Sequence, residues 1–542
     1  MSESEKKQRK RTPSFRIELS GNDETKNEIF SKLSEIRQHL SQQHNRPMGN
    51  LHVIQALFQK WDLDNTNGTI NESTDEVCPS SFVRSRKTET KQKIFLTAEE
   101  SFKRIIAIVE WHSRHCKAKL RTTKMLQKGH VCKTSLKCDS KERPHVFSWS
   151  SSPYLPNKEY LVNSRVNHGI ICSGILPADY KRFVKGAGIG AIADESRSSF
   201  FNVHAEHIQA EYEYSTEIAL LQEIASYDDL TSEIDIMSDA RHGWRKNAKD
   251  SSVVCIGDKT HKVLRCEHIT KAMDPVSQRH ERLGTERIYD YLNEKDVKVN
   301  VHCHDRNLSI NKFVREQTEA QNQNDTWHCV KAVKTALKNV SSGSKSSEGK
   351  TWSFQLSDKV EPVSTHIYWA IQNCDKDERK LQKLLLNVVD HYKNIHHDCH
   401  ENSRCKKDPK YEPSRIVITS PVAEKLLVNV ILNSTIYKHA KDYILGRDTF
   451  YVESFNNVTN IYQNKRIAFG DRQYNARANL SVLHWNENVD RGYTSISTQQ
   501  SHRAPRSRKG KKNYKKATYT FRDNIWSRYV KNVLRKKKQN QK

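Results

Sequence analysis

The sequence predicts a multidomain α/β protein, and three observations in its middle third carry that prediction. Runs rich in β-branched residues at 232–239, 253–257 and 263–269 are typical of neighbouring strands in an antiparallel meander. A helical periodicity then spans 282–292, and apolar and polar residues alternate strictly over 297–304. The full length of 542 residues is enough for more than one hydrophobic core.

An acidic residue ends two of these strands. Asp239 closes the first strand and Asp305 follows the fourth, and this order of strands, helix and acids predicts a ribonuclease H-like core. A third carboxylate is expected on a later helix at 449–465, where apolar residues recur at helical spacing and Glu453 lies on an adjoining polar stripe. Three such carboxylates hold two divalent cations roughly 3.5–4 Å apart. Mg²⁺, or Mn²⁺ in its place, prefers oxygen ligands of this kind.

Short motifs stand in a definite order between about residue 100 and residue 492. They are Asp239-Ala-Arg-His242, Asp305 with Ile310-Asn-Lys312, Asp325-Thr-Trp-His328 with Lys331, a segment rich in Trp, His and Cys, Tyr451-Val-Glu-Ser-Phe-Asn456, Lys465-Arg466, and Ala476-Arg-Ala-Asn-Leu-Ser-Val-Leu-His-Trp-Asn-Glu-Asn488. This order resembles the Kolobok-like group of cut-and-paste DNA transposases, with Mutator-like transposases next nearest.

The resemblance implies that Asp239, Asp305 and Glu453 are the catalytic DDE set and the ligands of Mg²⁺. Many members of the group have Asp-Gly-Arg where this chain has Asp239-Ala240-Arg241, a change that spares the metal ligand. Some members also carry an N-terminal zinc-dependent THAP module, which this sequence does not show. Asp325 has three open roles: support of the metal site, DNA binding, or a helix cap.

The composition favours a polyanionic partner. A net charge of +27 and a pI near 9.5 make nucleic acid the first choice, with an acidic membrane surface as the alternative. A hydrophobic fraction of 35% and a mean hydropathy of −0.84 indicate sizeable polar segments outside the core. No apolar run approaches the roughly 20 residues of a membrane-spanning helix, and the first eleven residues do not resemble a signal peptide. We expect an intracellular protein whose twelve cysteines are thiols or metal ligands.

The first 95 residues divide by composition into three segments. Residues 1–11 are a basic tail, interpreted as a nuclear-import signal, a phosphate-binding arm or a merely solvated stretch. Residues 12–61 contain two amphipathic helical stripes that should pack together. Residues 62–95 have the polar, aperiodic composition of a linker.

Histidine and cysteine are concentrated between residues 96 and 150. Zinc takes four tetrahedral nitrogen and sulfur ligands, and Cys116, Cys138 and His145, joined by His112 or Cys132, predict a structural site. The usual paired Cys-x-x-Cys is missing, so ordinary thiols and basic surface histidines are the alternative. Because the segment is also rich in lysine, we interpret it as a zinc-stabilised module that contacts DNA.

The middle of the chain is interpreted as a core in two parts. Residues 151–229 lead in through a long helix at 200–223, and residues 230–340 form the first part of the core. The 147 residues between the second aspartate and the glutamate exceed what a bare core needs, so a helical insertion is expected at 341–445 and the second part of the core at 446–492.

The expected insertion carries its own local signals. It opens on a flexible joint at 341–349, and Ser420-Pro421 should begin a helix that runs toward Tyr443. A second zinc site is compatible with His397, Cys399 and Cys405, with a loop of solvated histidines as the alternative.

The segment 493–542 is predicted to be a basic tail for DNA binding and nuclear import. Residues 501–542 contain sixteen Lys and Arg and one acid, a composition that neutralises phosphates without reading bases. Aromatic residues are interleaved with the charges, so part of the tail is expected to fold into a helix on DNA. The basic residues expected to contact DNA are Arg241, Lys465, Arg466, Lys511, Lys512, Lys515, Lys516, Lys536, Lys537 and Lys538.

These features together lead to a functional hypothesis. The chain is expected to be a nuclear DNA transposase that cleaves double-stranded transposon ends, joins them to target DNA, and acts as a homodimer or larger assembly. Two alternatives remain open: a host-recruited DNA-binding protein without catalysis, and a nuclease without strand transfer.

Overall fold

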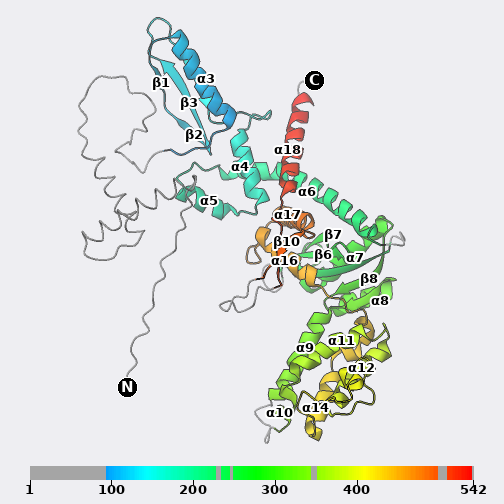
Figure 1. Cartoon of the computed structure of the whole chain (residues 1–542). Helices are drawn as coiled ribbons and strands as arrows, with labels where there is room; N and C mark the ends of the chain where they lie inside the picture. The colour runs from blue at the N-terminus through cyan, green and yellow to red at the C-terminus, as the bar shows by residue number, and fades with distance from the viewer. Residues whose placement is uncertain (1–92, 228–232, 244–247, 343–350, 499–509, 540–542) are drawn as a thin grey trace, which may run out of the picture. The chain divides into compact units, whose positions relative to one another are not determined.

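The structure, a computed structural model, describes residues 93–227, 233–243, 248–342, 351–498 and 510–539. These residues form a mixed α/β chain with sixteen α-helices and three β-sheets, the class that the sequence predicts (Figure 1). The predicted segments 1–11 and 12–61, and nearly all of the linker 62–95, lie outside the described residues. Among the described helices, none is long and apolar enough to cross a bilayer.

The segment 96–150 folds as a helix against a small antiparallel sheet. Helix α3 (Glu99–His115) precedes four strands, of which β3 pairs with β1 and β2 along one edge and with β4 along the other. The indole N–H of Trp149 donates to the carbonyl of Ser101 at 2.7 Å, which ties the last strand to the helix. The strands are β1 (Leu120–Thr122), β2 (Leu126–Lys128), β3 (Val131–Cys138) and β4 (Val146–Ser150).

Three helices lead from this module to the central sheet. They are α4 (Leu161–Cys172), α5 (Pro177–Gly186) and α6 (Asp194–Ile224). The long helix predicted at 200–223 is confirmed, although it begins earlier, where Asp194 and Glu195 place negative charge at the positive end of the helix dipole. Helix α6 runs beside α4, and it also lies beside two helices from the end of the chain, α17 (Asp471–Asn488) and α18 (Thr520–Gln539).

The central sheet has five strands in the order β7-β6-β5-β8-β9. The first three strands in sequence, β5, β6 and β7, are antiparallel, whereas β8 and β9 run parallel to β5. The strands are β5 (Glu233–His242), β6 (Asp250–Gly257), β7 (Val263–Thr270), β8 (Lys298–His304) and β9 (Gln321–Asn324). The four strands and the intervening helix that the sequence predicts are therefore confirmed.

Helices cover both faces of this sheet (Figure 1). On one face, Ile234 and Val253 pack in a core with α7 (His280–Glu294) and α8 (Leu308–Gln317). On the other face, Met237 and Val254 pack with α16 (Phe450–Tyr462) and α17 (Asp471–Asn488). Because side chains alternate along a strand, β5 contributes to both cores.

The described residues of 326–445 form a helical unit that lies between β9 and α16 and has a core of its own. Buried Val333 and Leu337 of the first helix share that core with Leu381 and Leu385 of α12. The unit therefore begins at α9, rather than at residue 341 as predicted, because α9 turns its apolar stripe toward this core. Most of the joint expected at 341–349 lies outside the described residues. The α-helices are α9 (Thr326–Ser342), α10 (Thr351–Ser357), α11 (Val360–Gln372), α12 (Glu378–Tyr392), α13 (Arg404–Lys407), α14 (Pro421–Leu432) and α15 (Thr435–Lys438).

The helix expected from Ser420 toward Tyr443 begins as predicted and ends early. The Ser420 hydroxyl accepts from the backbone N–H of Ala423, which caps the start of α14. The helix stops at Leu432 because Ser434 caps a new short helix in the same way. A serine that can satisfy free N–H groups favours a helix start over continuation of the previous helix.

The predicted basic tail is in large part a packed helix, which corrects the sequence-based expectation. After a hairpin of β10 (Tyr493–Ile496) and β11 (Lys512–Tyr514), helix α18 (Thr520–Gln539) lies against α6. Phe521, Ile525 and Tyr529 are buried, and Arg528 pairs with buried Glu211 at 2.7 Å. Apolar residues four positions apart form one stripe, and this stripe docks the helix on the protein without DNA.

Candidate active site and metal centres

The pairing of the parallel strands brings three aspartates to one edge of the central sheet. Asp239, Asp305 and Asp325 each stand one residue beyond the last paired positions that β5, β8 and β9 share. The sequence places Asp239 at the end of its strand, but β5 continues to His242 because its pairing with β6 is longer than its pairing with β8. At Asp239, therefore, the pairing of β5 with β8 has ended, while the pairing of β5 with β6 continues.

Asp239 is partly buried and faces helix α16. Asn456 donates to Asp239 Oδ2 at 3.2 Å, and the backbone N–H of Ala240 donates to Oδ1 at 2.7 Å. Burial and the nearby charge of Asp305 raise the pKa of Asp239 to about 6, although these two hydrogen bonds act in the opposite direction. The positive charge of Lys465 also acts to lower this pKa, but burial and the charge of Asp305 outweigh it.

His328 lies between Asp305 and Glu453 and shows that these two acids converge. Its Nδ1 is 3.5 Å from Asp305 Oδ1, and its Nε2 is 3.7 Å from Glu453 Oε1. A single imidazole ring thus spans the gap between a carboxylate after β8 and one on the first turn of α16. About half of each carboxylate side chain is exposed, 44% for Asp305 and 52% for Glu453, so the group is open to a ligand.

Asp325 is buried and its oxygens are already used. One oxygen accepts from the backbone N–H of His328 at 2.6 Å, which caps α9, and the other accepts from both the N–H and the hydroxyl of Thr449. The same Thr449 hydroxyl lies 3.3 Å from Asp305. Of the three roles considered for Asp325, a helix cap matches these contacts. Support of the metal site is compatible with them, because Asp325, Asp305 and His328 offer ligand atoms within 4.8 Å of one another.

A fifth carboxylate near the site, Glu281, is absent from the sequence-based prediction. Glu281, in the first turn of α7, is partly buried and accepts from Asn307 at 2.7 Å. Burial raises its pKa to about 7, and the charges of Asp239 and Asp305 act in the same direction. Its position after a strand and at a helix start is common to many glutamates, so no local pattern distinguishes it.

Arg241 does not have the role that the sequence suggests. Its side chain is buried, and its guanidinium donates to Asn460 and to the side chain and carbonyl of Gln463. Because Arg241 is two residues beyond Asp239, both lie on the face of β5 that α16 covers. Arg241 therefore fixes the end of α16 and does not reach a phosphate, whereas Lys465 and Arg466, just after that helix, are exposed.

Comparison of the chain with protein-family models and with curated proteins gives no match. The resemblance to cut-and-paste transposases therefore stays a prediction that rests on the motifs of the sequence. The arrangement of the acids is an independent observation, because it follows from strand pairing and side-chain contacts.

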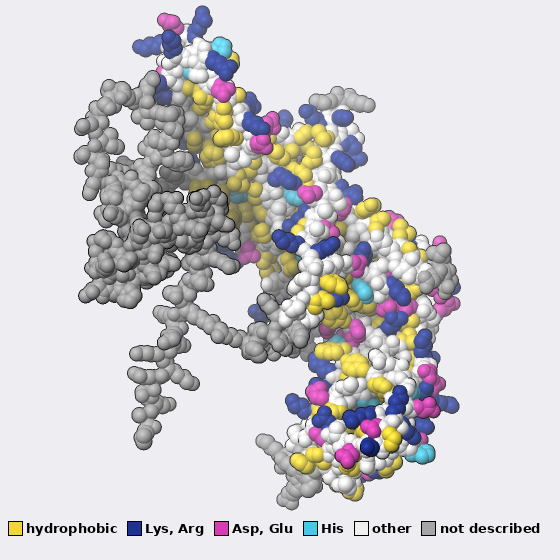
Figure 2. Space-filling model, viewed as in Figure 1, with side chains coloured by type: hydrophobic (Ala, Val, Ile, Leu, Met, Phe, Trp, Pro, Cys, Tyr) yellow, Lys and Arg dark blue, Asp and Glu magenta, His cyan; other side chains and the backbone are white. Residues whose placement is uncertain are grey.

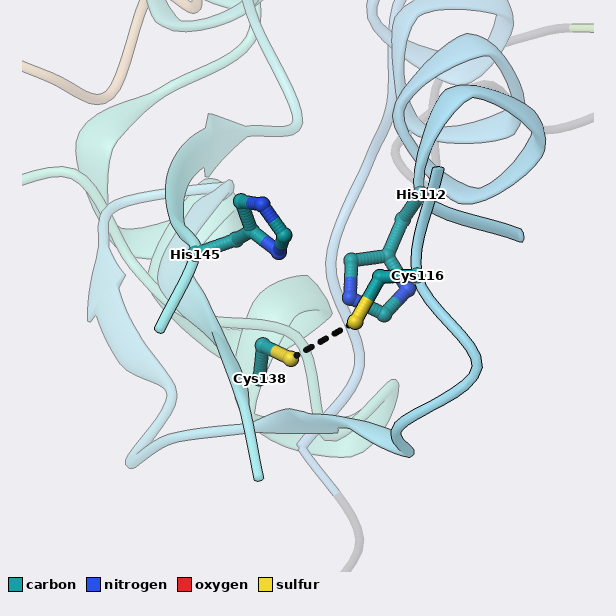
Figure 3. Close-up of side chains that lie close together, drawn as sticks. All are labelled: His112, Cys116, Cys138 and His145. Carbon is teal, nitrogen blue, oxygen red and sulfur yellow. Dashed lines mark hydrogen bonds between the residues drawn. The ribbon is translucent and has the colours of Figure 1, made fainter. Parts of the chain in front are cut away.

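A first Cys/His centre joins α3 to the small N-terminal sheet (Figure 3). His112 comes from α3 and Cys116 follows it, while Cys138 ends β3 and His145 precedes β4. One ligand atom from each of the four lies within 4.8 Å of all the others, and the two sulfur atoms are 3.6 Å apart. The set of two nitrogens and two sulfurs suits tetrahedral zinc. Buried ring nitrogens of His112 and His145 have no hydrogen-bond partner, so both have capacity for a metal.

Cys132 is not part of this centre, which corrects one of the predicted ligands. It shares β3 with Cys138 but stands six residues away, a separation of about 20 Å along a strand. Burial raises the pKa of the Cys132 thiol. At Cys138 burial acts in the same direction, but hydrogen bonds, first among them the one from the backbone N–H of Ser140, bring its pKa below the ordinary value. Cys138 therefore has the environment of a thiolate ligand.

A second Cys/His centre lies at the end of α12, and one of its predicted ligands is also wrong. His391, His396, Cys399 and Cys405 offer ligand atoms within 4.8 Å of one another. The side chain of His397 is instead 89% exposed and turns to Asp398. Consecutive side chains point in different directions. The imidazole of His396 therefore lies in the group, whereas that of His397 lies in solvent. The Cys/His character of both centres supports a metal such as zinc.

The remaining basic residues expected to contact DNA are at the surface. Lys511, Lys512, Lys515 and Lys516 are exposed around β11, and Lys536, Lys537 and Lys538 are exposed at the end of α18. Figure 2 shows Lys and Arg side chains along this C-terminal helix. The packing of α18 holds these last three charges on a rigid helix.

The raised pKa of Asp239 predicts a stability effect whose size depends on pH. A carboxyl with a raised pKa in the folded state stabilises the protein below its ordinary pKa of 3.8, and this contribution is lost as pH rises through about 6. In metal-free protein at pH 8, Asp239→Asn should therefore increase the free energy of unfolding by roughly 1–3 kcal/mol, with a smaller gain at pH 5. Urea unfolding in the presence of a chelator measures this change in the free energy of unfolding. Asp471→Asn is the control, because Lys249 lowers the pKa of Asp471 and no gain should follow. A gain at Asp239 that is independent of pH would contradict the prediction.

The first Cys/His centre predicts a difference between two cysteines of one strand. Cys138→Ala should remove bound zinc from this centre, since a tetrahedral site that loses a thiolate binds much more weakly. Cys132→Ala, at the other end of β3, should keep it. Zinc per chain, determined by elemental analysis of the purified proteins, separates the two. Equal zinc contents would show that the four side chains do not form a metal site.

Proposed function

We propose that this chain is a DDE-type DNA transposase that cleaves double-stranded DNA at transposon ends and transfers the freed strand to target DNA. The observation that carries the proposal is the convergence of Asp239, Asp305 and Glu453 at the edge of the central sheet. Asn456 links α16 to Asp239, and His328 links Glu453 to Asp305. The three acids are far apart in sequence, and nothing local brings them together.

The sheet supports a ribonuclease H-like core as part of the proposal. Three antiparallel strands are followed by two that run parallel to the first, in the order β7-β6-β5-β8-β9, with helices on both faces. In this interpretation the helical unit is an insertion between the core strands and α16. It leaves the core at α9 and returns before Glu453.

The acids and their surroundings fit divalent cations. Asp239, Asp305 and Glu453 offer oxygen ligands, and the raised pKa of Asp239 shows that its negative charge is poorly compensated. When bound, Mg²⁺ or Mn²⁺ polarises a phosphodiester and activates water or a 3′-hydroxyl. Asn456 orients the carboxylate of Asp239, and Thr449 orients that of Asp305. His328 lies between Glu453 and Asp305. Its ring forms with Asp305 and Asp325 a group whose ligand atoms lie within 4.8 Å of one another.

DNA is the partner that the charges support best. Lys465 is close enough to Asp239 to lower its pKa, so an exposed cation stands beside the acids where a phosphate would enter. The basic hairpin and the end of α18 offer further phosphate contacts. We place the protein in the nucleus and expect a homodimer or larger assembly, because two transposon ends must be held together.

Catalysis is tested by Glu453→Gln, which keeps the side-chain shape and removes the charge. Mg²⁺-dependent nicking and joining of the element's own ends should fall at least 100-fold, since a missing metal ligand leaves the phosphate without its activating charge. DNA affinity should change little. Glu361→Gln, at an exposed glutamate of the helical unit, is the matched control and should remain active. Full activity of Glu453→Gln would remove Glu453 from the mechanism.

The same assay on wild type separates the alternative functions. Nicks without joined products would identify a nuclease, and binding without cleavage would identify a DNA-binding protein.

DNA binding is tested by neutralising charge while keeping the helix. Deletion of residues 501–542 would also remove the buried stripe of α18, so Lys536, Lys537 and Lys538 should be replaced by glutamine. The slope of log affinity against log salt should become shallower by about one unit for each lysine that contacts phosphate. The control replaces the exposed Lys376, Lys383 and Lys425 of the helical unit. Equal slopes in both triple variants would show that α18 is not a specific DNA contact.

A further inference from the structure

A further group of histidine and cysteine side chains is buried beneath helix α18. His168 and Cys172 belong to α4, where a spacing of four residues places both on one face, and His204 comes from α6. His204 and Cys172 are fully buried, and His168 is 6% exposed. One ligand atom of each lies within 4.8 Å of the other two. No motif in the sequence assigns these residues to a site.

The hydrogen bonding within this group is incomplete. His168 Nδ1 is 2.9 Å from His204 Nε2 and 3.6 Å from Cys172 Sγ. In either tautomer His168 Nδ1 can make only one hydrogen bond, so it cannot satisfy both His204 and Cys172. The buried Nδ1 of His204 has no partner at all.

The surroundings of the group do not explain why it is polar. The rings of Phe200 and Tyr529 pack against His204 at centroid distances of 4.9 and 5.5 Å, and Trp526 packs against His168 at 5.4 Å. Apolar side chains of similar size would fill this space without the cost of burying polar atoms. A bound cation would instead use the lone pairs of all three residues together.

We propose that His168, Cys172 and His204 bind a transition-metal ion, with Zn²⁺ as the best match. Two imidazoles and one thiolate are borderline ligands of the kind that zinc prefers, and they approach one another as closely as ligands of one ion do. Three protein ligands leave one tetrahedral position for water or another small ligand.

This ion has a structural role. It cross-links α4 to α6 at the place where α18 docks, because Trp526 and Tyr529 of α18 lie on the two histidine rings. Metal binding at this position therefore stabilises the platform under the basic C-terminal helix. The site is separate from the acidic group and from the two Cys/His centres described above, so it stands independently of the proposed function.

The decisive experiment counts zinc in the full-length protein and in two buried-cysteine variants. Cys172→Ala should lower the zinc content by about one ion per chain relative to wild type. Cys255→Ala is the matched control, because Cys255 is equally buried in the central sheet and belongs to none of the metal-binding groups in the described chain. Equal zinc contents in wild type and folded Cys172→Ala overturn the proposal.

A measurement on wild type keeps the test valid if Cys172→Ala does not fold. Alkylation of the full-length protein in mild urea, followed by mass spectrometry, reports each cysteine separately. A chelator should increase the alkylation rate of Cys172 and leave that of Cys255 unchanged, since a metal-bound thiolate is protected. His204→Gln, which retains a hydrogen-bonding amide, should remove the protection in the absence of chelator. Alkylation of Cys172 that does not respond to chelator shows a hydrogen-bonded triad without metal and refutes the proposal.

Discussion

The parallel pairing of β5 with β8, and of β8 with β9, is the constraint on which the rest of the candidate active site depends. It sets Asp239, Asp305 and Asp325 side by side at one edge of the sheet. Like charges at this separation repel, so each carboxylate needs a different means of compensation. The charge of Asp325 is stabilised by hydrogen bonds, and that of Asp305 by contact with solvent. Asp239 instead has a raised pKa, so it holds its proton to a higher pH. The sheet thus creates a concentration of negative charge that it does not itself neutralise.

Local sequence patterns predict the elements of this fold well. Alternation at 297–304 and the helical stripes on α7, α12 and α16 are visible in the sequence, because one face of each element is buried and the other is not. Asp239 and Asp305 could be found because each directly follows a recognisable strand pattern. The role of Arg241 could not be predicted from the sequence, because its burial depends on α16, which lies more than two hundred residues later in the chain. Glu281 was missed because only the folded sheet brings it near Asp239.

The metal centres show where spacing in the sequence is informative and where it is not. His112 and Cys116 are one helical turn apart, so a shared site could be predicted, but the choice between His112 and Cys132 required the register of β3. His397 and His396 are adjacent in sequence and differ only in the direction of their side chains. The stripe of α18 was present in the sequence as apolar residues four positions apart, but the surrounding charge made a tail the simpler interpretation.

Asp325 explains how a long helical unit can be accommodated without disturbing the acids beside it. It caps α9, where the chain leaves the sheet, and it holds Thr449, where the chain returns to form α16. The backbone adds a second link at the same place, because the N–H of Thr326 donates to the carbonyl of Arg447 at 3.0 Å. Arg447 in turn pairs with Asp235 and Asp258 of the sheet region. The two ends of the helical unit, before α9 and before α16, are therefore held together at one place beside the sheet. Because Glu453 is one turn beyond Thr449, its position relative to Asp305 depends on these contacts and not on the size of the unit between them.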